Sequence, residues 1–237
     1  MDTKTFLAII PARSGSKRLK DKNIKILGNK PLLAWSIESA LNSKYVNEVV
    51  VTTDSEHYAN IAQEYGANTP FLRPQELSRD CSSSFEAIKH TILFYRDLLA
   101  KKFDYTILLQ PTSPLRKSFH IDEACELLLQ NNKQSIISVT PCEHSPLWTN
   151  TLPQNHSMDN FLAQDICNTR SQDLPTYYRL NGAIYIANTD ILLKKESFFI
   201  KDSMAYCMDN LYSIDIDTEL DFAFAEFLIH NMPHKFH

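Results

Sequence analysis

The chain has 237 residues, of which 43% are hydrophobic and 22% are charged, with a formal net charge of −4. A mildly acidic chain carries no basic field for duplex nucleic acid or anionic membrane, and no apolar run approaches the about 20 residues that span a bilayer. The five cysteines are scattered without a CxxC pair, which favours reduced thiols in the cytoplasm over disulfides or structural zinc.

In the first 140 residues, short apolar runs alternate with longer amphipathic ones. The pattern predicts strands at 7–10, 48–53, 105–109 and 135–140, and helices at 31–41, 82–99 and 118–130, with another helical stretch ending at 65. Strands that alternate with helices form a mostly parallel sheet covered on both faces. We therefore expect a three-layer, Rossmann-like α/β fold with its ligands at the carboxyl ends of the strands.

The pattern changes near residue 141. Residues 141–180 are polar and rich in Pro, Asn, Gln and Asp, which predicts a small inserted lobe of hairpins and loops within one domain spanning 1–237. A strand is expected at 182–186, then a last strand leading to residues 215–217 and a closing helix at 218–229. The lobe has no obvious core for its larger apolar side chains, which favours their being covered by another chain: Trp148, Leu152, Phe161, Tyr177 and Tyr178.

A basic loop follows the first predicted strand. Five cationic residues lie between positions 13 and 23, together with Ser14, Gly15 and Ser16. Small residues allow backbone N–H groups to approach a ligand and the cations supply charge, a combination suited to a polyphosphate. Neither a Walker A sequence nor a GxGxxG turn is present, and a solvated basic loop is the alternative interpretation of this segment alone.

Residues 10–23, IPARSGSKRLKDKN, are similar to the nucleotide-binding opening of the CMP-sialic acid synthetases (acylneuraminate cytidylyltransferases) and of their relatives that activate legionaminate, pseudaminate and 3-deoxy-octulosonate. The resemblance implies the nucleotidyltransferase version of the expected fold and CTP as the co-substrate. It also implies that Arg13, Lys17 and Lys22 contact the triphosphate and that Asn23 orients it. Ser14, Gly15 and Ser16 would form a backbone cradle.

Two later segments resemble the same family. Residues 72–84, which include Asp80 and Ser82, resemble "RPxELAxDxxSS"; this implies that Arg73 and a serine, Ser83 or Ser84, line the cytidine pocket. The serines also suit the cap of the next helix, and both readings can hold together. Residues 109–116 match "LQPTSPLR", which implies that Gln110 reaches the acidic sugar, whereas Arg116 is either a site residue or a structural ion-pair partner.

Residues 170–185 resemble "RQxLPxxxRxNGAIY" of the same family. Arg suits bidentate recognition of a carboxylate, so Arg170 and Arg179 are candidates for the sugar's acid group, with Asn181 and Tyr185 as further pocket residues. Phe198 and Phe199 fit the family's apolar wall beside the N-acyl group, although aromatics of this kind also suit a core.

Asp215 and Asp217 alternate along the last predicted strand, which would place both carboxylates on one face. Mg²⁺ prefers carboxylate and phosphate oxygens, and "SIDIDTELD" closely matches the family's metal-binding segment. We expect these residues to bind Mg²⁺. A helix cap by Asp217 is the alternative role and is compatible with metal binding.

The combined resemblance implies Mg²⁺-dependent, in-line transfer of CMP from CTP to an acidic nine-carbon sugar, with Arg13, Lys22 and Asp217 as catalytic residues. It also implies a cytoplasmic homodimer formed through the inserted lobe, with pocket residues crossing between subunits. Trp148 stands where one family pattern has a lysine, which leaves sialic acid, legionaminate, pseudaminate and, less favoured, 3-deoxy-octulosonate open. Two other classes of protein are the alternatives. One is a GT-A glycosyltransferase, because Asp215 and Asp217 resemble the DxD motif of that class, and the other is a non-catalytic nucleotide sensor.

Overall fold

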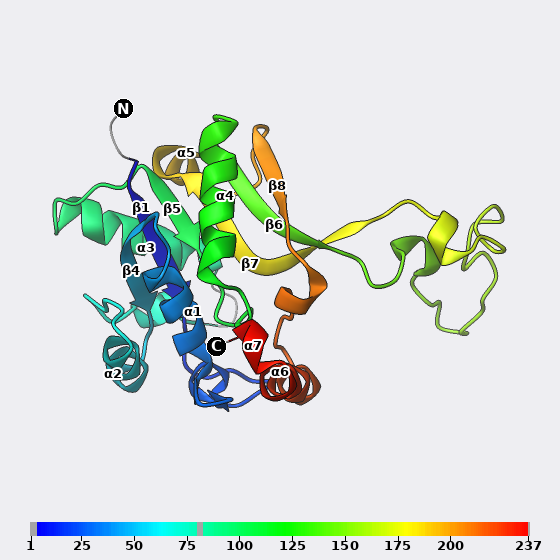
Figure 1. Cartoon of the computed structure of the whole chain (residues 1–237), viewed down its shortest axis with the longest axis horizontal. Helices are drawn as coiled ribbons and strands as arrows, with labels where there is room; N and C mark the ends of the chain where they lie inside the picture. The colour runs from blue at the N-terminus through cyan, green and yellow to red at the C-terminus, as the bar shows by residue number, and fades with distance from the viewer. Residues whose placement is uncertain (1–3, 80–82, 237) are drawn as a thin grey trace.

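A six-stranded sheet forms the centre of the computed structural model, which describes residues 4–79 and 83–236 (Figure 1). In the order β4-β1-β5-β7-β6-β8, its strands are Val46–Thr52, Phe6–Pro11, Tyr105–Leu108, Tyr178–Asn188, Ser135–Pro141 and Ser203–Cys207. β1 is parallel to β4 and β5, and β6 is parallel to β8, whereas β7 runs antiparallel to both of its neighbours. The predicted α/β fold with a mostly parallel sheet is confirmed, with β7 as the exception.

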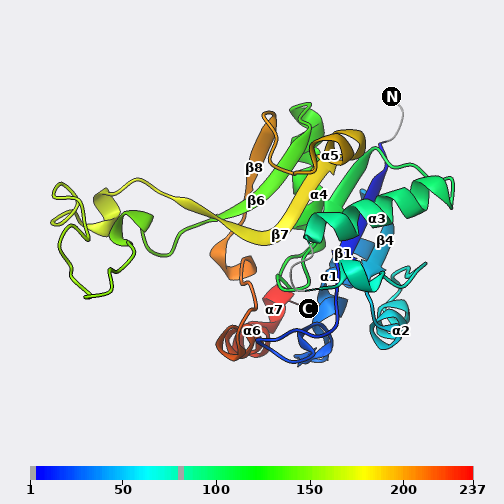
Figure 2. The same ribbon diagram turned by 180° about the vertical axis from the view of Figure 1, so that it is seen from behind.

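Helices cover both faces of this sheet, as the three-layer prediction required. Ala8 and Ile10 of β1 pack with α1 (Leu32–Leu41), α2 (Glu56–Glu64) and α4 (Ser118–Gln130), while Leu7 and Ile9 pack with α3 (Ser84–Asp97) and α5 (Thr189–Lys195). Successive side chains of a strand point to opposite faces, so a continuous apolar run serves both layers. Figure 1 views the face covered by α1 and α4, and Figure 2 views the face covered by α3 and α5.

Several elements differ from the predicted ones. Neither α5 nor the two-stranded ribbon of β2 (Ile26–Leu27) and β3 (Lys30–Pro31) was predicted, because elements this short leave no periodic signal. β7 begins at Tyr178 instead of residue 182, since its first residues pair with the end of β6. The predicted helix start at Ser82, and Asp80 of the same motif, lie outside the described residues.

The chain between β6 and β7 forms an arm, residues 142–177, which projects away from the sheet (Figures 1 and 2). It contains two short 3₁₀ helices, η3 (Pro146–Trp148) and η4 (Ser171–Asp173), and no strand. The prediction of hairpins was therefore wrong. Polar side chains satisfy the backbone locally instead, as where Asn155 Oδ1 accepts from Ser157 N at 3.1 Å.

A third apolar cluster joins the C-terminal region to the loop after β1. Phe222 and Ile229 of α6 (Glu219–Asn231) and Phe236 of α7 (Pro233–Phe236) pack with Leu19 and Ile216. This packing brings residues 215–217 beside the basic loop, although about 200 positions separate them in sequence. No helix in the described ranges is both long enough and apolar enough to cross a membrane.

Candidate active site

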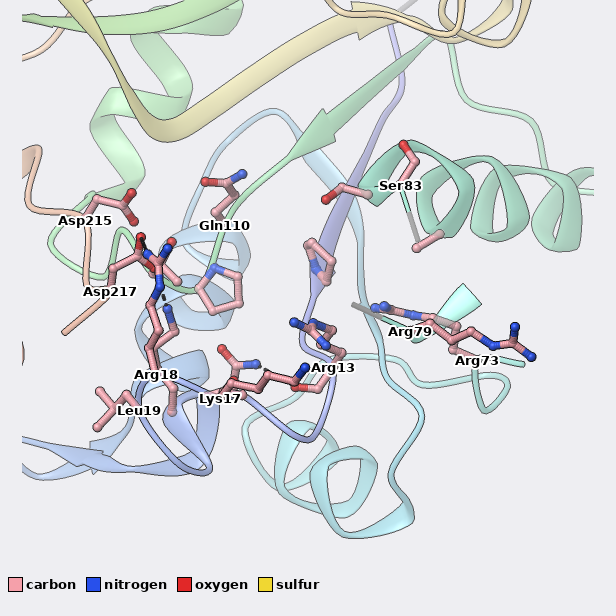
Figure 3. A pocket seen from close by; sticks show the side chains of 18 of the residues that line it. Arg13, Lys17, Arg18, Leu19, Arg73, Arg79, Ser83, Gln110, Asp215 and Asp217 are labelled. Carbon is pink, nitrogen blue, oxygen red and sulfur yellow. Dashed lines mark hydrogen bonds and ion pairs between the residues drawn. The ribbon is translucent and has the colours of Figure 1, made fainter. Parts of the chain in front are cut away.

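A cavity of about 630 Å³ lies at the carboxyl ends of β1 and β5, where an α/β sheet places its ligand (Figure 3). Asp215 and Asp217 lie on one side, Arg73 and Arg79 on the other, and the loop after β1 between them. Eleven of the predicted site residues line this cavity: Arg13, Ser16, Lys17, Lys22, Asn23, Arg73, Ser83, Ser84, Gln110, Asp215 and Asp217.

The cavity is strongly cationic although the chain is acidic overall. Its lining includes six cationic side chains and two carboxylates: Arg13, Lys17, Arg18, Lys22, Arg73, Arg79, Asp215 and Asp217. Arg18, Arg79 and Thr112 line it without having been predicted as site residues. The signal for each was its place in a segment that the sequence already pointed to: the basic loop, residues 72–84 and residues 109–116. A local excess of positive charge over negative charge suits a polyanion such as a nucleoside triphosphate.

Hydrogen bonds to Asp54 and from Asn23 fix the loop after β1 in place. Ser14 donates to Asp54 from its backbone N and from Oγ, each at 2.7 Å, and Asn23 Nδ2 donates to the Arg13 carbonyl at 3.0 Å. Burial alone would raise the pKa of Asp54, but the two bonds from Ser14, a bond from the backbone of Asp54 itself and the Arg73 charge together lower it. Because Asp54 occupies the Ser14 N–H, that group does not join the predicted cradle. Ser16 lines the cavity, whereas Gly15, whose φ of +72° suits glycine, does not.

Lys22 links the basic loop to the acidic segment. Its Nζ donates to the Ile216 carbonyl at 2.7 Å and to Asp217 Oδ1 at 3.0 Å, and Arg18 Nη1 approaches Asp217 Oδ2 at 3.3 Å. The Lys22 side chain is only 12% exposed, whereas that of Arg18 is 76% exposed. Lys22 is thus fixed in place, while Arg18 can leave Asp217 at little cost.

Asp215 and Asp217 both line the cavity, but the reason differs from the predicted one. Residues 215–217 belong to no strand, so the strand prediction was wrong here. The backbone is instead held where Ile216 N donates to the Thr112 carbonyl at 2.7 Å, with the Ile216 side chain fully buried between the two acids. Burial raises the pKa of Asp215, and the neighbouring Asp217 carboxylate adds to this.

The alternative role of Asp217 as a helix cap is corrected by the structure. Thr218 is the N-cap of α6, and its hydroxyl and the Asp221 carboxylate form a capping box. Asp217 donates only its backbone N–H to Asp221, at 3.1 Å. Its side chain is therefore directed to the cations of the cavity.

The far side of the cavity is formed by Arg73 and the start of α3. Arg73 is 6% exposed, its Nε donates to Thr52 Oγ1 at 3.2 Å, and burial lowers its pKa to about 10. Ser83 lines the cavity and also caps α3, because its Oγ accepts from Phe85 N at 3.1 Å. Both interpretations of this serine, as pocket residue and as cap, agree with its placement.

Gln110 enters the cavity from the end of β5, and its amide lies directly against Gly182 of β7. A Cβ built on Gly182 would lie 2.5 Å from Gln110 Oε1 and 3.1 Å from Ser113 Oγ. Gly182 also has a φ of +70°, so only glycine suits both the backbone and the contact. The glycine of the NGAIY segment is therefore explained by the space that Gln110 occupies.

Asn181 does not line the cavity, and its predicted contact with substrate stays a prediction. It is 1% exposed, its Oδ1 accepts from Ser138 Oγ at 2.6 Å, and its Nδ2 donates to Ser213 Oγ at 3.0 Å. Both ends of the amide are thus occupied within the fold. Asn181 joins β7 to β6 and to the segment that leads to Asp215.

The remaining predicted sugar residues also lie outside the lining of this cavity. Tyr185 is half-buried and contacts both aromatics, with ring centroids 5.7 Å from Phe198 and 6.4 Å from Phe199. Phe198 is 8% exposed and belongs to the core, as its alternative interpretation had it, whereas Phe199 is 59% exposed. Burial raises the pKa of Tyr185, and the Asp215 carboxylate adds to it.

The two predicted carboxylate-binding arginines pair with acids of their own chain. Arg170, at the start of η4 in the arm, donates to Asp173 at 2.8 Å, and Arg179 donates to Glu143 at 2.7 Å. Neither lines the cavity. The bond to Glu143 raises the pKa of Arg179, and Asp215 contributes to this shift.

The acidic pair fits Mg²⁺ by its chemistry. No group of three or more His, Cys, Asp or Glu side chains that could hold a metal occurs among residues 4–79 and 83–236. Mg²⁺ is commonly bound through one or two carboxylates with the rest of its shell from water and substrate phosphates. Two carboxylates beside a polyanion pocket match that donor set, and a cation would relieve the repulsion between them.

Sheet and cavity together define a nucleotide-binding α/β protein whose pocket suits a polyphosphate. The chain belongs to the cytidylyltransferase family, whose profile matches residues 7–230. The resemblance noted from the sequence motifs is thereby confirmed.

Individual relatives agree with this assignment. The chain is 45% identical to an N-acylneuraminate cytidylyltransferase of Escherichia coli over 95% of its own length, but it spans only 52% of that protein. It is 39% identical to a CMP-N,N'-diacetyllegionaminic acid synthase of Legionella pneumophila, over 94% of this chain and 96% of the relative. A solved structure of CMP:2-keto-3-deoxy-manno-octonic acid synthetase complexed with CTP superposes with a TM-score of 0.72 and 16% identity, covering 97% of this chain and 100% of that one. At 16% identity this match supports the fold alone.

Proposed function

We propose that this chain transfers CMP from CTP to an acidic nine-carbon sugar, an N-acylneuraminate or a related nonulosonate, and releases pyrophosphate. One observation carries the proposal: a single cavity brings the basic loop after β1, Gln110 and the acidic pair 215–217 together. The names of the relatives from Escherichia coli and Legionella pneumophila support the same chemistry.

CTP would occupy the cationic cavity. Arg13 and Lys17 face the triphosphate with Ser16, and Arg73 lies on the cytidine side with the serines that begin α3. Asn23 acts indirectly, since it holds the Arg13 carbonyl and hence the shape of the loop. Positioning and neutralisation of charge supply most of the acceleration in transfers of this kind.

Asp215 and Asp217 would hold Mg²⁺ together with phosphate oxygens. When bound, the ion lowers the pKa of the attacking hydroxyl and neutralises phosphate charge. Lys22 keeps Asp217 in place through its bonds to Asp217 and to the Ile216 carbonyl. Arg18 is well exposed, so it is free to turn from Asp217 toward the substrate.

The reaction is a direct displacement. The anomeric hydroxyl oxygen of the sugar forms a bond to the α-phosphorus, its proton passes to water, and the bond from that phosphorus to the pyrophosphate oxygen breaks. Lys22 and Arg13 stabilise the negative charge that develops on the phosphates. No covalent enzyme intermediate is required.

For the sugar, we propose contacts from Gln110 and from the surface formed by Tyr185 and Phe199. Arg179 is a further candidate, because Arg suits bidentate recognition of the sugar's carboxylate. N-acylneuraminate is the favoured substrate, and legionaminate or pseudaminate is the alternative. Trp148, in place of a lysine of one family pattern, is the residue that bears on this choice.

We also propose that the chain is one domain that dimerises through the arm in the cytoplasm. The arm and the first residues of β7 expose large apolar side chains to solvent: Leu152 (55% exposed), Met158 (61%), Tyr178 (52%) and Leu180 (50%). A partner subunit would bury them. Since Arg170 lies in the projecting arm and not in the cavity of its own chain, it would reach the cavity of the partner.

The test is a pyrophosphate-release assay with CTP, Mg²⁺ and a panel of sialic, legionaminic, pseudaminic and octulosonic acids. The proposal predicts release with at least one nonulosonic acid and preference for CTP over UTP. A GT-A glycosyltransferase would instead consume a preformed nucleotide sugar, and a sensor would bind CTP without turnover with any sugar. Either result would contradict the proposal.

A further inference from the structure

Arg116 is a fully buried cation beneath the cavity, and it has no carboxylate partner among the described residues. It is 1% exposed. Its guanidinium donates to the Ser113 carbonyl at 2.8 Å, to Ser36 Oγ at 2.9 Å and to the Gln110 carbonyl at 3.3 Å, while its Nε has no hydrogen-bond partner. The ion-pair alternative considered for this residue is therefore wrong within the described ranges.

Packing alone does not explain a charge at this position. Taking a cation out of water is costly, and a buried ionic group can often be replaced by an apolar side chain of similar volume without loss of stability. Burial also lowers the pKa of Arg116 to about 9, and the Arg116 charge contributes, after burial, to lowering the pKa of His120. The fold thus buries a charge at a cost in free energy, and its partners are two carbonyls of one turn and the Ser36 hydroxyl.

That turn, residues 110–113, is the part of the chain that joins the two halves of the cavity. Gln110, Pro111 and Thr112 all line the cavity. The Thr112 carbonyl accepts from Ile216 N at 2.7 Å, and its side chain bonds to Asp215 and so lowers the pKa of that carboxyl against burial. Through the turn, the guanidinium is connected both to the Gln110 side chain and to the acidic segment.

We infer that Arg116 is a positioning residue of the reaction: its fork of donors fixes the turn 110–113, and so places Gln110 for the sugar and Asp215 for the metal. Lysine cannot replace it, because a single ammonium cannot reproduce the planar fork that spans two carbonyls and a hydroxyl. The inference rests on the proposed function for the roles of Gln110 and Asp215. The β1 loop is held by Asp54 and Asn23 instead, so CTP binding should depend little on Arg116.

The experiment compares Arg116→Lys and Arg116→Met with Leu128→Ala. Leu128 is a fully buried residue near the end of α4, in a core cluster that includes no residue of the turn 110–113, so it serves as a control for lost stability. We expect Arg116→Lys to fold and to lose about 10²-fold in kcat, the size typical of a displaced catalytic group, with KM for CTP nearly unchanged. Leu128→Ala should lower the thermal midpoint but keep its kcat.

Equal kcat losses in Arg116→Lys and Leu128→Ala at equal thermal destabilisation would overturn the inference, as would an unchanged kcat in Arg116→Lys. If Arg116→Met does not fold, the lysine variant decides. A crystal structure of Arg116→Lys gives a readout without activity: a turn 110–113 that superposes on the wild type contradicts the inference. A wild-type protein that is inactive with every nonulosonic acid would contradict the proposed function and not the positioning of the turn by Arg116.

Discussion

Gly182→Ala offers a sharp test, because the structure predicts both what it disturbs and by how much. The added Cβ would lie 2.5 Å from Gln110 Oε1, a separation that carbon and oxygen do not tolerate, so the flexible amide end must move. The left-handed backbone at φ +70° adds a cost of about 1–2 kcal/mol for alanine. A lost hydrogen bond to a charged substrate is worth about 1.5–3 kcal/mol.

The expected result is a loss of stability of about 1–2 kcal/mol together with a fall in kcat/KM for the sugar of about 10- to 10²-fold. Gly66→Ala is the matched control. Gly66 has a φ of +90°, and its added Cβ would meet Leu41 Cδ1 at 3.1 Å, away from the cavity. It should lose similar stability while keeping the kinetics of the wild type.

The assay is steady-state pyrophosphate release, with urea unfolding to measure stability. Gln110→Ala and the double variant complete a double-mutant cycle. If Gly182 acts by leaving space for the Gln110 amide, Gly182→Ala should cost little extra in kcat/KM once Gln110 is alanine. Independent, additive kinetic losses would refute the reasoning, and so would full activity of Gly182→Ala toward the sugar.

Three further predictions follow from the same structure. Lys22→Ala and Asp217→Ala should fold yet lose about 10²–10³ in kcat, roughly 3–4 kcal/mol, in the pyrophosphate assay; unchanged turnover of Asp217→Ala would contradict the metal assignment. Burial lowers the pKa of His120 to about 4, so the neutral ring favours the folded state; stability is complete above the unfolded pKa near 6.5 and falls as the pH drops toward 4. Urea unfolding should show His120→Asn losing about 2 kcal/mol less than the wild type between pH 8 and pH 5, and parallel losses would contradict the shift. Mixing inactive Arg170→Ala with inactive Asp217→Ala should restore activity if Arg170 completes the partner's cavity, whereas no recovery after subunit exchange would exclude a shared site.

The layers of the fold were predictable because β1, β5 and the second half of β4 are buried on both faces and rich in apolar residues, while α1 and α4 show helical spacing. The antiparallel direction of β7 was not predictable. The arm that separates it from β6 is long enough to return the chain in either direction, and a run buried on both faces gives no sign of direction. The strand expected at 215–217 failed for a similar reason, since alternating residues can also arise from one buried side chain, Ile216, held by a single backbone bond.

Motif positions identified the cavity better than they identified individual contacts. Asn181 and Gly182 are adjacent in sequence, yet the Asn181 amide is hydrogen-bonded within the fold, whereas Gly182 leaves space for the Gln110 side chain. Sequence order cannot separate these roles, because they depend on which face of β7 meets which neighbour. The pairing of Lys22 with Asp217 could not be predicted from the sequence either, since the packing of α6 brings these two distant segments together.

The central claim is that one cavity joins CTP and a nonulosonic acid for direct transfer. The most direct measurement is a product analysis of the purified chain with CTP, Mg²⁺ and N-acetylneuraminate or a legionaminic acid. The account predicts CMP-sugar and pyrophosphate in equal amounts, and loss of both in Asp217→Ala. Pyrophosphate-free consumption of a preformed nucleotide sugar, or CTP binding without product for every nonulosonic acid, would contradict it.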